Sequence, residues 1–128
     1  MEAHHYSDKT DDAPIYWLTI PDFGKTGSGV TVMPTTASSV TPGSSSPHLS
    51  YNTYFLSAGT VTVKAYLSPT INYLARPEGM RFGISFDDDD PVIESFNGDT
   101  EAGRANNIIV SSTSYEIANA GAHVLKYW

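Results

Sequence analysis

Residues 60–68, TVTVKAYLS, alternate between apolar and polar side chains. The apolar residues recur at every second position from Val61 to Leu67, and Thr62 and Lys64 lie between them. Because successive side chains of a strand point to opposite faces, a period of two is typical of a half-buried antiparallel β-strand. This stretch therefore predicts that the chain builds at least one sheet with a single buried face.

The same alternation, or an enrichment in β-branched and aromatic residues, recurs along the whole chain, and helical periodicity is almost absent. Residues that set turn geometry separate these runs, and residues 38–47, SSVTPGSSSP, form the clearest loop. Many short strands at this spacing indicate a β-sandwich or a barrel. The further runs are IYWLTI (15–20), GVTVM (29–33), LSYNTYFL (49–56), MRFGISF (80–86) and HVLKYW (123–128).

Length and charge narrow the class of protein. A chain of 128 residues fits one domain, here residues 1–128, and it has no cysteine. The formal net charge of -7, with seven scattered lysines and arginines, argues against a nucleic-acid partner. No apolar run approaches the roughly 18–20 residues of a membrane span, and no signal peptide is visible at the N-terminus. We therefore expect neither a nucleic-acid nor a membrane partner.

Four consecutive aspartates, Asp87–Asp90, precede Pro91 between two strand-like runs. Asp and Pro favour turns, so we interpret the run as a solvated hairpin tip. A calcium site would need about six to eight converging oxygens, and the run lacks the EF-hand spacing. A catalytic pair would need facing carboxylates about 5 to 10 Å apart, which adjacent residues on a turn do not guarantee. Both remain alternatives.

Other catalytic and metal motifs are weak. The four histidines lack zinc-ligand spacing, and no serine lies in a G-x-S-x-G motif. The aromatic residues are the remaining candidates, because an exposed ring can stack on a sugar. The candidate carbohydrate-binding residues are Tyr51, Tyr54, Tyr73, Arg81 and Asn107.

Five stretches follow one another along the chain: IYWLTIPDFGKTGSGVTVMPTTASS (15–39), PHLSYNTYF (47–55), VKAYLSPTINY (63–73), GMRFGISFDDDDP (79–91) and GAHVLKYW (121–128). Together they resemble the C-terminal domain of glycoside hydrolase family 115, the xylan α-1,2-glucuronidases. The opening MEAHHYS resembles the start of carbohydrate-binding modules of families 6 and 35. The resemblance implies a two-sheet antiparallel jelly roll, and it implies that Asp87 and Asp88 belong to a family hairpin, S-F-D-D-G-x-P.

The sequence departs from the family pattern at three places. His4 stands where the related modules carry a glutamate that binds calcium, so we expect no cofactor, with a structural calcium as the alternative. The family has a tryptophan ahead of its V-x-x-N segment, whereas GDTEAGRANNII (98–109) contains none, although Asn107 matches the asparagine of that segment. The family continues into a last strand beyond HVLKYW, so we expect a fold that lacks this strand.

The resemblance implies an accessory domain without catalytic residues of its own. Its partners would be the upstream catalytic domains or a second protomer, together with glucuronoxylan, and its location would be secreted or periplasmic. The alternatives are an autonomous carbohydrate-binding module, in which Arg76, Arg81 or Arg104 would pair with a uronic acid, and a purely structural sandwich for protein contacts.

Overall fold

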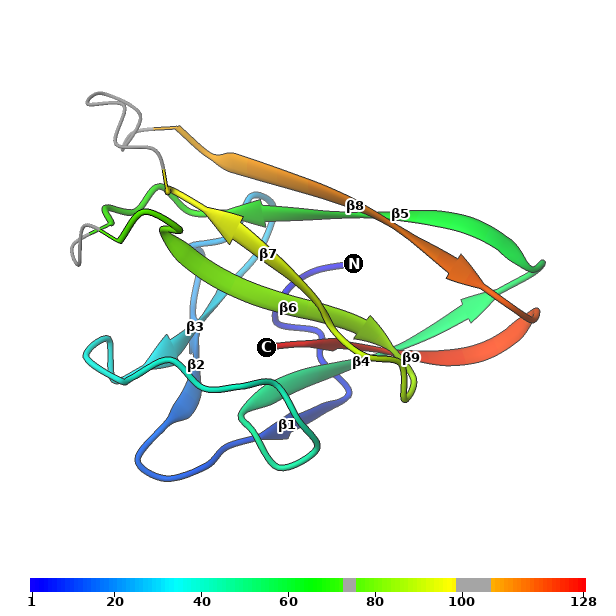
Figure 1. Cartoon of the computed structure of the whole chain (residues 1–128), viewed down its shortest axis with the longest axis horizontal. Helices are drawn as coiled ribbons and strands as arrows, with labels where there is room; N and C mark the ends of the chain where they lie inside the picture. Colours follow the sequence, from blue (N-terminus) through cyan, green and yellow to red (C-terminus); the bar gives the residue numbers. More distant parts are fainter. Residues whose placement is uncertain (73–75, 99–106) are drawn as a thin grey trace. The chain divides into compact units, whose positions relative to one another are not determined.

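The computed structural model describes residues 1–72, 76–98 and 107–128, and all regular structure in them is β-strand (Figure 1). The part of the chain described contains no helix that could cross a membrane. The strands are β1 (Asp8–Thr10), β2 (Tyr16–Ile20), β3 (Gly29–Met33), β4 (His48–Phe55), β5 (Gly59–Leu67), β6 (Met80–Phe86), β7 (Val92–Phe96), β8 (Ile109–Ile117) and β9 (Gly121–Tyr127).

The predicted all-β class is confirmed. Strands β3 and β6 coincide with the predicted runs, and the bounds of β2, β4, β5 and β9 differ from them by one or two residues. The pairs β1–β4, β2–β3, β5–β8 and β6–β9 are antiparallel. One sheet has the order β1-β4-β9-β6-β7, while β2–β3 and β5–β8 form two-stranded sheets. The last strand, β9, therefore lies inside the five-stranded sheet, whose edges are β1 and β7.

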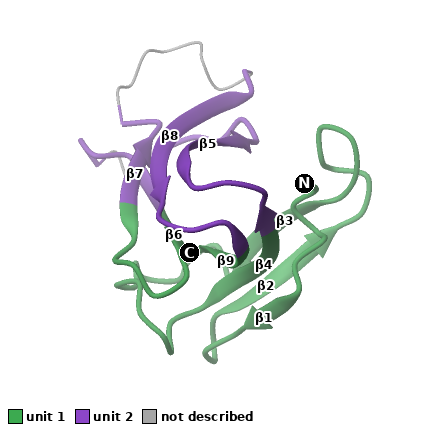
Figure 2. Ribbon diagram, turned by 90° about the vertical axis from the view of Figure 1, so that its right-hand side faces the viewer, with its two compact units in different colours: residues 1–53, 83–92, 122–128 green, residues 54–82, 93–121 purple. Residues whose placement is uncertain are grey.

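The chain divides into two compact units (Figure 2). Unit 1 contains residues 1–53, 83–92 and 122–128, and unit 2 contains residues 54–82 and 93–121. The sequence predicted a single domain, and this expectation stays a prediction.

The core of unit 1 lies on the inner face of the large sheet. Leu49, Ile84 and Phe86 are almost fully buried there. Trp17 of β2 packs against Tyr127 of β9, with ring centroids 5.8 Å apart. The β2–β3 pair thus covers part of this face, as expected for two layers that share one apolar core.

The β5–β8 pair of unit 2 shows why alternation predicted a strand at residues 60–68. Val61 lies opposite Tyr115, and these positions belong to the less exposed face of the pair. On the other face Thr60 lies opposite Glu116 and donates a hydrogen bond of 2.6 Å to its carboxylate. The register therefore gathers apolar side chains on one face and polar ones on the other.

Unit 2 also contains a tight backbone approach at Gly79, where φ is +68°. A β-carbon at this position would collide with the carbonyl oxygen of Phe96 and the amide of Gly98. Glycine fits because it has no β-carbon and accepts a positive φ. Gly79 thereby allows the start of β6 to lie close to the end of β7, where the ring centroids of Phe82 and Phe96 are 5.9 Å apart.

A pair of leucine substitutions tests the core of unit 1. Leu49 is 0% exposed and Leu56 is 91% exposed. We expect Leu49→Ala to lower the free energy of unfolding by about 2–5 kcal/mol, because it removes buried methyl groups and leaves a cavity. Leu56→Ala, the matched control, should change it by less than about 0.5 kcal/mol. Urea titration followed by circular dichroism measures both, and equal effects would contradict the assigned core.

Candidate functional site

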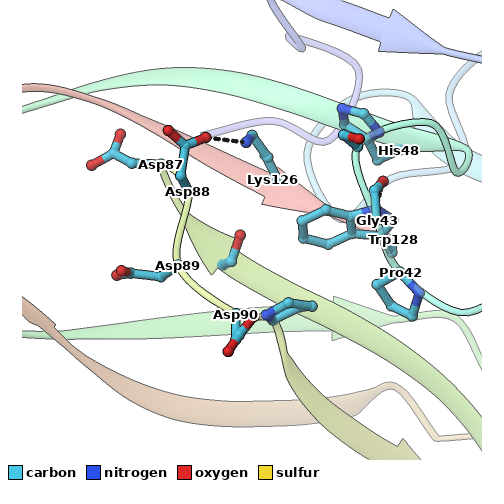
Figure 3. A pocket seen from close by; sticks show the side chains of 12 residues that line it. Pro42, Gly43, His48, Asp87, Asp88, Asp89, Asp90, Lys126 and Trp128 are labelled. Carbon is cyan, nitrogen blue, oxygen red and sulfur yellow. Dashed lines mark hydrogen bonds and ion pairs between the residues drawn. The ribbon is translucent and has the colours of Figure 1, made fainter.

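A pocket in unit 1 has a volume of about 280 Å³ (Figure 3). It forms where a loop, the start of β4, the end of β6, the turn after β6 and the end of β9 come together. Its lining consists of residues 42–44, His48, Ser85, residues 87–91, Lys126 and Trp128.

The four aspartates form the turn between β6 and β7, as the sequence predicted. Asp88, Asp89 and Asp90 are exposed, and the amide of Asp89 donates to the carbonyl of Phe86 at 3.0 Å. Asp87 adopts a positive φ of 51°, a conformation that aspartate tolerates better than most residues. The turn interpretation accounts for three of the four residues, and Asp87 has a further role.

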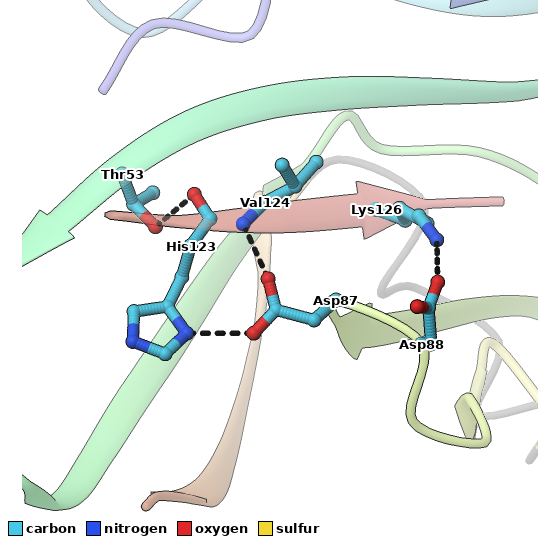
Figure 4. Close-up of polar contacts among 6 residues, drawn as sticks. All are labelled: Thr53, Asp87, Asp88, His123, Val124 and Lys126. Atoms are coloured by element: carbon cyan, nitrogen blue, oxygen red, sulfur yellow. Dashed lines mark hydrogen bonds and ion pairs between the residues drawn. The ribbon is translucent and has the colours of Figure 1, made fainter. Parts of the chain in front are cut away.

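Asp87 connects the turn to β9 through both of its carboxylate oxygens (Figure 4). Oδ1 accepts a hydrogen bond of 2.8 Å from the backbone N–H of Val124. Oδ2 lies 2.6 Å from Nδ1 of His123. The backbone amide of Asp87 donates in turn to the carbonyl of Val124 at 2.8 Å. These three contacts fix the turn against β9.

The same contacts set the charge state of Asp87. Desolvation by the surrounding atoms raises the pKa of its carboxyl group, but the hydrogen bonds from Val124 and His123 and the positive charges of His123 and Lys126 outweigh it. The pKa therefore lies below its ordinary value of 3.8. A carboxyl group shifted in this direction is ionised at neutral pH and is a poor proton donor.

Asp88 faces Lys126, with Nζ and Oδ1 3.3 Å apart (Figure 3). The Asp88 side chain is fully exposed, whereas that of Lys126 is one quarter exposed. Exposed ion pairs of this kind contribute little to stability. The pair instead places one ammonium group and one carboxylate side by side at the rim of the pocket.

Trp128 forms an aromatic wall of the pocket. Its backbone exchanges two hydrogen bonds of 3.0 Å with Gly83, and its indole N–H donates to the carbonyl of Gly43 at 3.4 Å. The indole ring lies 5.4 Å from the ring of His48. Nδ1 of His48 lies 2.7 Å from the carbonyl oxygen of Ser46, so Nδ1 carries the hydrogen and Nε2 is the acceptor of the neutral ring.

Ser85 lines the pocket with a buried hydroxyl group. Ser85 is 1% exposed. Within residues 1–72, 76–98 and 107–128 its Oγ has no hydrogen-bond partner. Buried polar groups are nearly always paired, so an unpaired one at a pocket needs an explanation.

The candidate carbohydrate-binding residues that the sequence suggested do not form one site in the described residues. Tyr51 is buried in unit 1, where its hydroxyl donates to the carbonyl of Ala3 at 2.7 Å and burial raises its pKa to about 12. Tyr54 is exposed in unit 2, as are Arg81 and Asn107. Within the described ranges none of these three is hydrogen-bonded to another. Tyr73 and Arg104 lie outside the described residues, and Arg76 is exposed.

Sequence reasoning did not place His48, Ser85, Lys126 or Trp128 in a site. They come from segments far apart in the chain, and no local pattern connects them. A signal was nevertheless present, since these residues lie in PHLS, FGISFDDDDP and HVLKYW, three of the stretches that carried the family resemblance.

The resemblance to carbohydrate-binding modules connects the N-terminal residues with calcium, which prefers oxygen ligands. Glu2 is hydrogen-bonded to Thr26, and His4 presents a ring nitrogen, 3.3 Å from the carbonyl of Ser28. Residues 1–72, 76–98 and 107–128 contain no cluster of three or more histidine, aspartate or glutamate side chains that could hold a metal ion. The expectation about calcium stays a prediction.

Replacing Asp87 tests the connection between the turn and β9. Because the folded pKa of Asp87 lies below the unfolded one, its contribution to stability is present above about pH 4 and is lost as the pH falls through the folded value. We expect Asp87→Asn to lower the free energy of unfolding by about 1 kcal/mol at pH 7, discounted for the partial exposure of the carboxylate. The difference from the unmodified chain should shrink below pH 4.

Asp89→Asn is the matched control, because Asp89 contributes a backbone amide to the turn and its side chain is exposed. Denaturant titrations at several pH values measure both variants. A loss of stability for Asp87→Asn that is the same at pH 3 and pH 7 would show that its charge plays no part.

Comparisons with known proteins address the identity of the chain. The model of the glycosyl hydrolase family 115 C-terminal domain matches residues 1–128. A search of curated proteins finds no match. The family match confirms the resemblance seen in the sequence and covers both units. The chain belongs to the family of C-terminal domains of glycosyl hydrolase family 115.

Proposed function

We propose that the chain is a non-catalytic accessory domain of a xylan-debranching α-glucuronidase. Membership of the C-terminal domain family supports a parent protein that is a glycoside hydrolase with its catalytic domains upstream. The accessory role would consist of packing against those domains, assembling a dimer and positioning glucuronoxylan. Because xylan is an extracellular polymer, the proposal includes a secreted or periplasmic location.

The observation that carries the non-catalytic role is the engagement of the acidic turn. Both oxygens of Asp87 are bonded to β9, and Asp88 is paired with Lys126. Glycoside hydrolysis ordinarily uses a carboxylic acid of raised pKa together with a second carboxylate. The pKa of Asp87 is lowered instead, as is that of Asp11, which accepts a hydrogen bond from Lys9.

Exposed apolar side chains of unit 2 support a packing role. Tyr66 and Val110 face each other across β5–β8, on the face whose other positions are mostly polar. Both are about half exposed, and Ile108, just before β8, is more exposed still. Exposed apolar residues that cluster in this way are typical of a contact surface. In the parent enzyme this surface would rest on another domain or on the second protomer.

The alternative of an autonomous carbohydrate-binding module is favoured by a different observation, the pocket of unit 1 with its half-buried Trp128. An indole ring beside hydrogen-bonding groups is well suited to a sugar. The two roles are compatible in one accessory domain, because the Tyr66–Val110 pair and the pocket belong to different units.

The catalytic half of the proposal is tested with the purified 128-residue chain. We expect no release of 4-O-methylglucuronic acid from aldouronic acids, measured by anion-exchange chromatography over a day. A family 115 α-glucuronidase serves as the positive control. Hydrolysis by the chain itself would contradict a non-catalytic role.

The proposed packing role is tested by making one substitution both in the isolated chain and in the parent enzyme. Val110→Glu should change the unfolding free energy of the isolated chain by less than about 0.5 kcal/mol, because Val110 is exposed there. In the parent enzyme it should lower the unfolding temperature or the dimer fraction, measured by calorimetry and sedimentation. The control, Ser57→Glu, lies beyond the opposite end of the β5–β8 pair and should do neither. Equal behaviour of the two variants in the parent enzyme would contradict packing through this face.

A further inference from the structure

The pocket of unit 1 combines three features that the accessory role leaves unexplained. Ser85 presents a buried hydroxyl without a partner in the described residues. Trp128 presents an indole ring whose N–H is already engaged by Gly43. Asp88 and Lys126 present an acceptor and a donor at the rim. A ligand that matches all three needs an apolar face and several hydroxyl groups.

The distribution of charge selects against ionic ligands. The side chains of Ser85 and Trp128, which are buried and half-buried, are neutral, whereas Asp88, Asp89 and Asp90 are exposed and solvated. The carboxylates of Asp88, Asp89 and Asp90 outnumber the one ammonium group of Lys126 at the rim, and this net negative charge disfavours an anion such as a uronic acid. A cation would be attracted by the rim and by the face of Trp128, but Lys126 already holds an ammonium group beside Asp88 at this rim. The inner wall therefore fits a neutral ligand.

The size of the pocket limits the ligand further. Ligand sites commonly have volumes of about 300–1,000 Å³. The volume here, about 280 Å³, lies just below that range. It suits one sugar ring better than a longer stretch of polysaccharide.

We propose that this pocket binds one neutral pyranose unit, the unsubstituted xylose of a xylan main chain. The ring stacks on Trp128, one hydroxyl pairs with Ser85, and others bond to the Asp88–Lys126 pair. The choice of xylose rests on the proposed function, whereas the preference for a neutral pyranose rests on the pocket alone. The domain would thus hold the polymer by its undecorated backbone and leave the acidic branch for the catalytic domains.

Indole N–H signals in a ¹⁵N–¹H spectrum of the full 128-residue chain provide the test. The chain has two tryptophans, Trp17 in the core and Trp128 in the pocket, so two signals are expected and Trp128→Phe assigns them. Titration with xylohexaose should shift the Trp128 signal to saturation and leave the Trp17 signal in place. Methyl glucoside should shift the same signal at higher concentration, because the pocket holds one ring and each xylohexaose molecule presents six. Glucuronic acid and glucosamine, at the same pH and ionic strength, should shift it less than methyl glucoside does.

Two variants separate binding from folding. Ser85→Ala should raise the dissociation constant for xylohexaose about tenfold, because it removes one hydrogen bond to the sugar. It should not lower the urea midpoint, because the hydroxyl that it removes has no partner in the free protein. Tyr54→Ala, which removes an exposed ring of unit 2, should leave the dissociation constant unchanged.

Several outcomes would overturn the proposal. They are a Trp128 signal that xylohexaose does not move, an equal or larger response to glucuronic acid or glucosamine, and an unchanged affinity in Ser85→Ala, which would show that the hydroxyl binds only water. None of these results affects the hydrolysis or packing tests, so failure of the pocket and failure of the accessory role are distinguishable. A response to methyl glucoside without one to xylohexaose would overturn the assignment to xylan and point to a neutral pyranose from another source.

Discussion

The arrangement of unit 1 depends on a side chain that takes the place of a backbone acceptor. The β6–β9 ladder pairs Ser85 with Lys126 and Phe86 with Leu125, and the next step brings Asp87 opposite Val124. At a φ of 51° Asp87 leaves the strand conformation, and its carboxylate, rather than its carbonyl, accepts the bond from the Val124 amide. The ladder therefore gains one more pair of hydrogen bonds while the chain already turns. The remaining aspartates of the turn line the pocket beside Lys126 and Trp128, which the β6–β9 pairing holds opposite Ser85 and Gly83.

This substitution of a side chain for a backbone group explains why an acidic run that resembles a catalytic or metal site behaves as a structural element. Asp87 is neither free to bind a substrate nor poised to donate a proton, because its oxygens are bonded to Val124 and His123. The exposed aspartates after it act through their charge at the rim. The chemistry of the pocket lies instead in the neutral groups below the rim, with Ser85 the most buried of them.

The sequence predicted those strands whose buried face is apolar, and β3 and β6 were located to the residue. It did not predict β8, because Ser111 and Thr113 occupy the less exposed face and interrupt the apolar alternation. Their opposite partners are Ala65 and Val63 of β5, so tertiary pairing supplies the apolar environment that the local pattern lacks. The pocket was missed for a related reason: its residues converge through sheet pairing. Exposure is likewise a tertiary property, which is why Tyr51, a candidate for sugar stacking, is part of the core.

The distance in sequence between β5 and β8 has a consequence for the newly made chain. Residues 68–108 separate the two strands, and a ribosome that adds about 5–20 residues per second needs roughly 2–8 s to produce them. During this interval β5, a strand rich in valine and threonine, has no partner of its own sheet. Such a strand is prone to pair with other chains. Lys64, in the middle of β5 and exposed on its outer face, places a charge where a foreign strand would stack, which is how natural sequences discourage aggregation. We therefore expect the polar residues of β5 to discourage such pairing during synthesis, before they face solvent in the finished sheet.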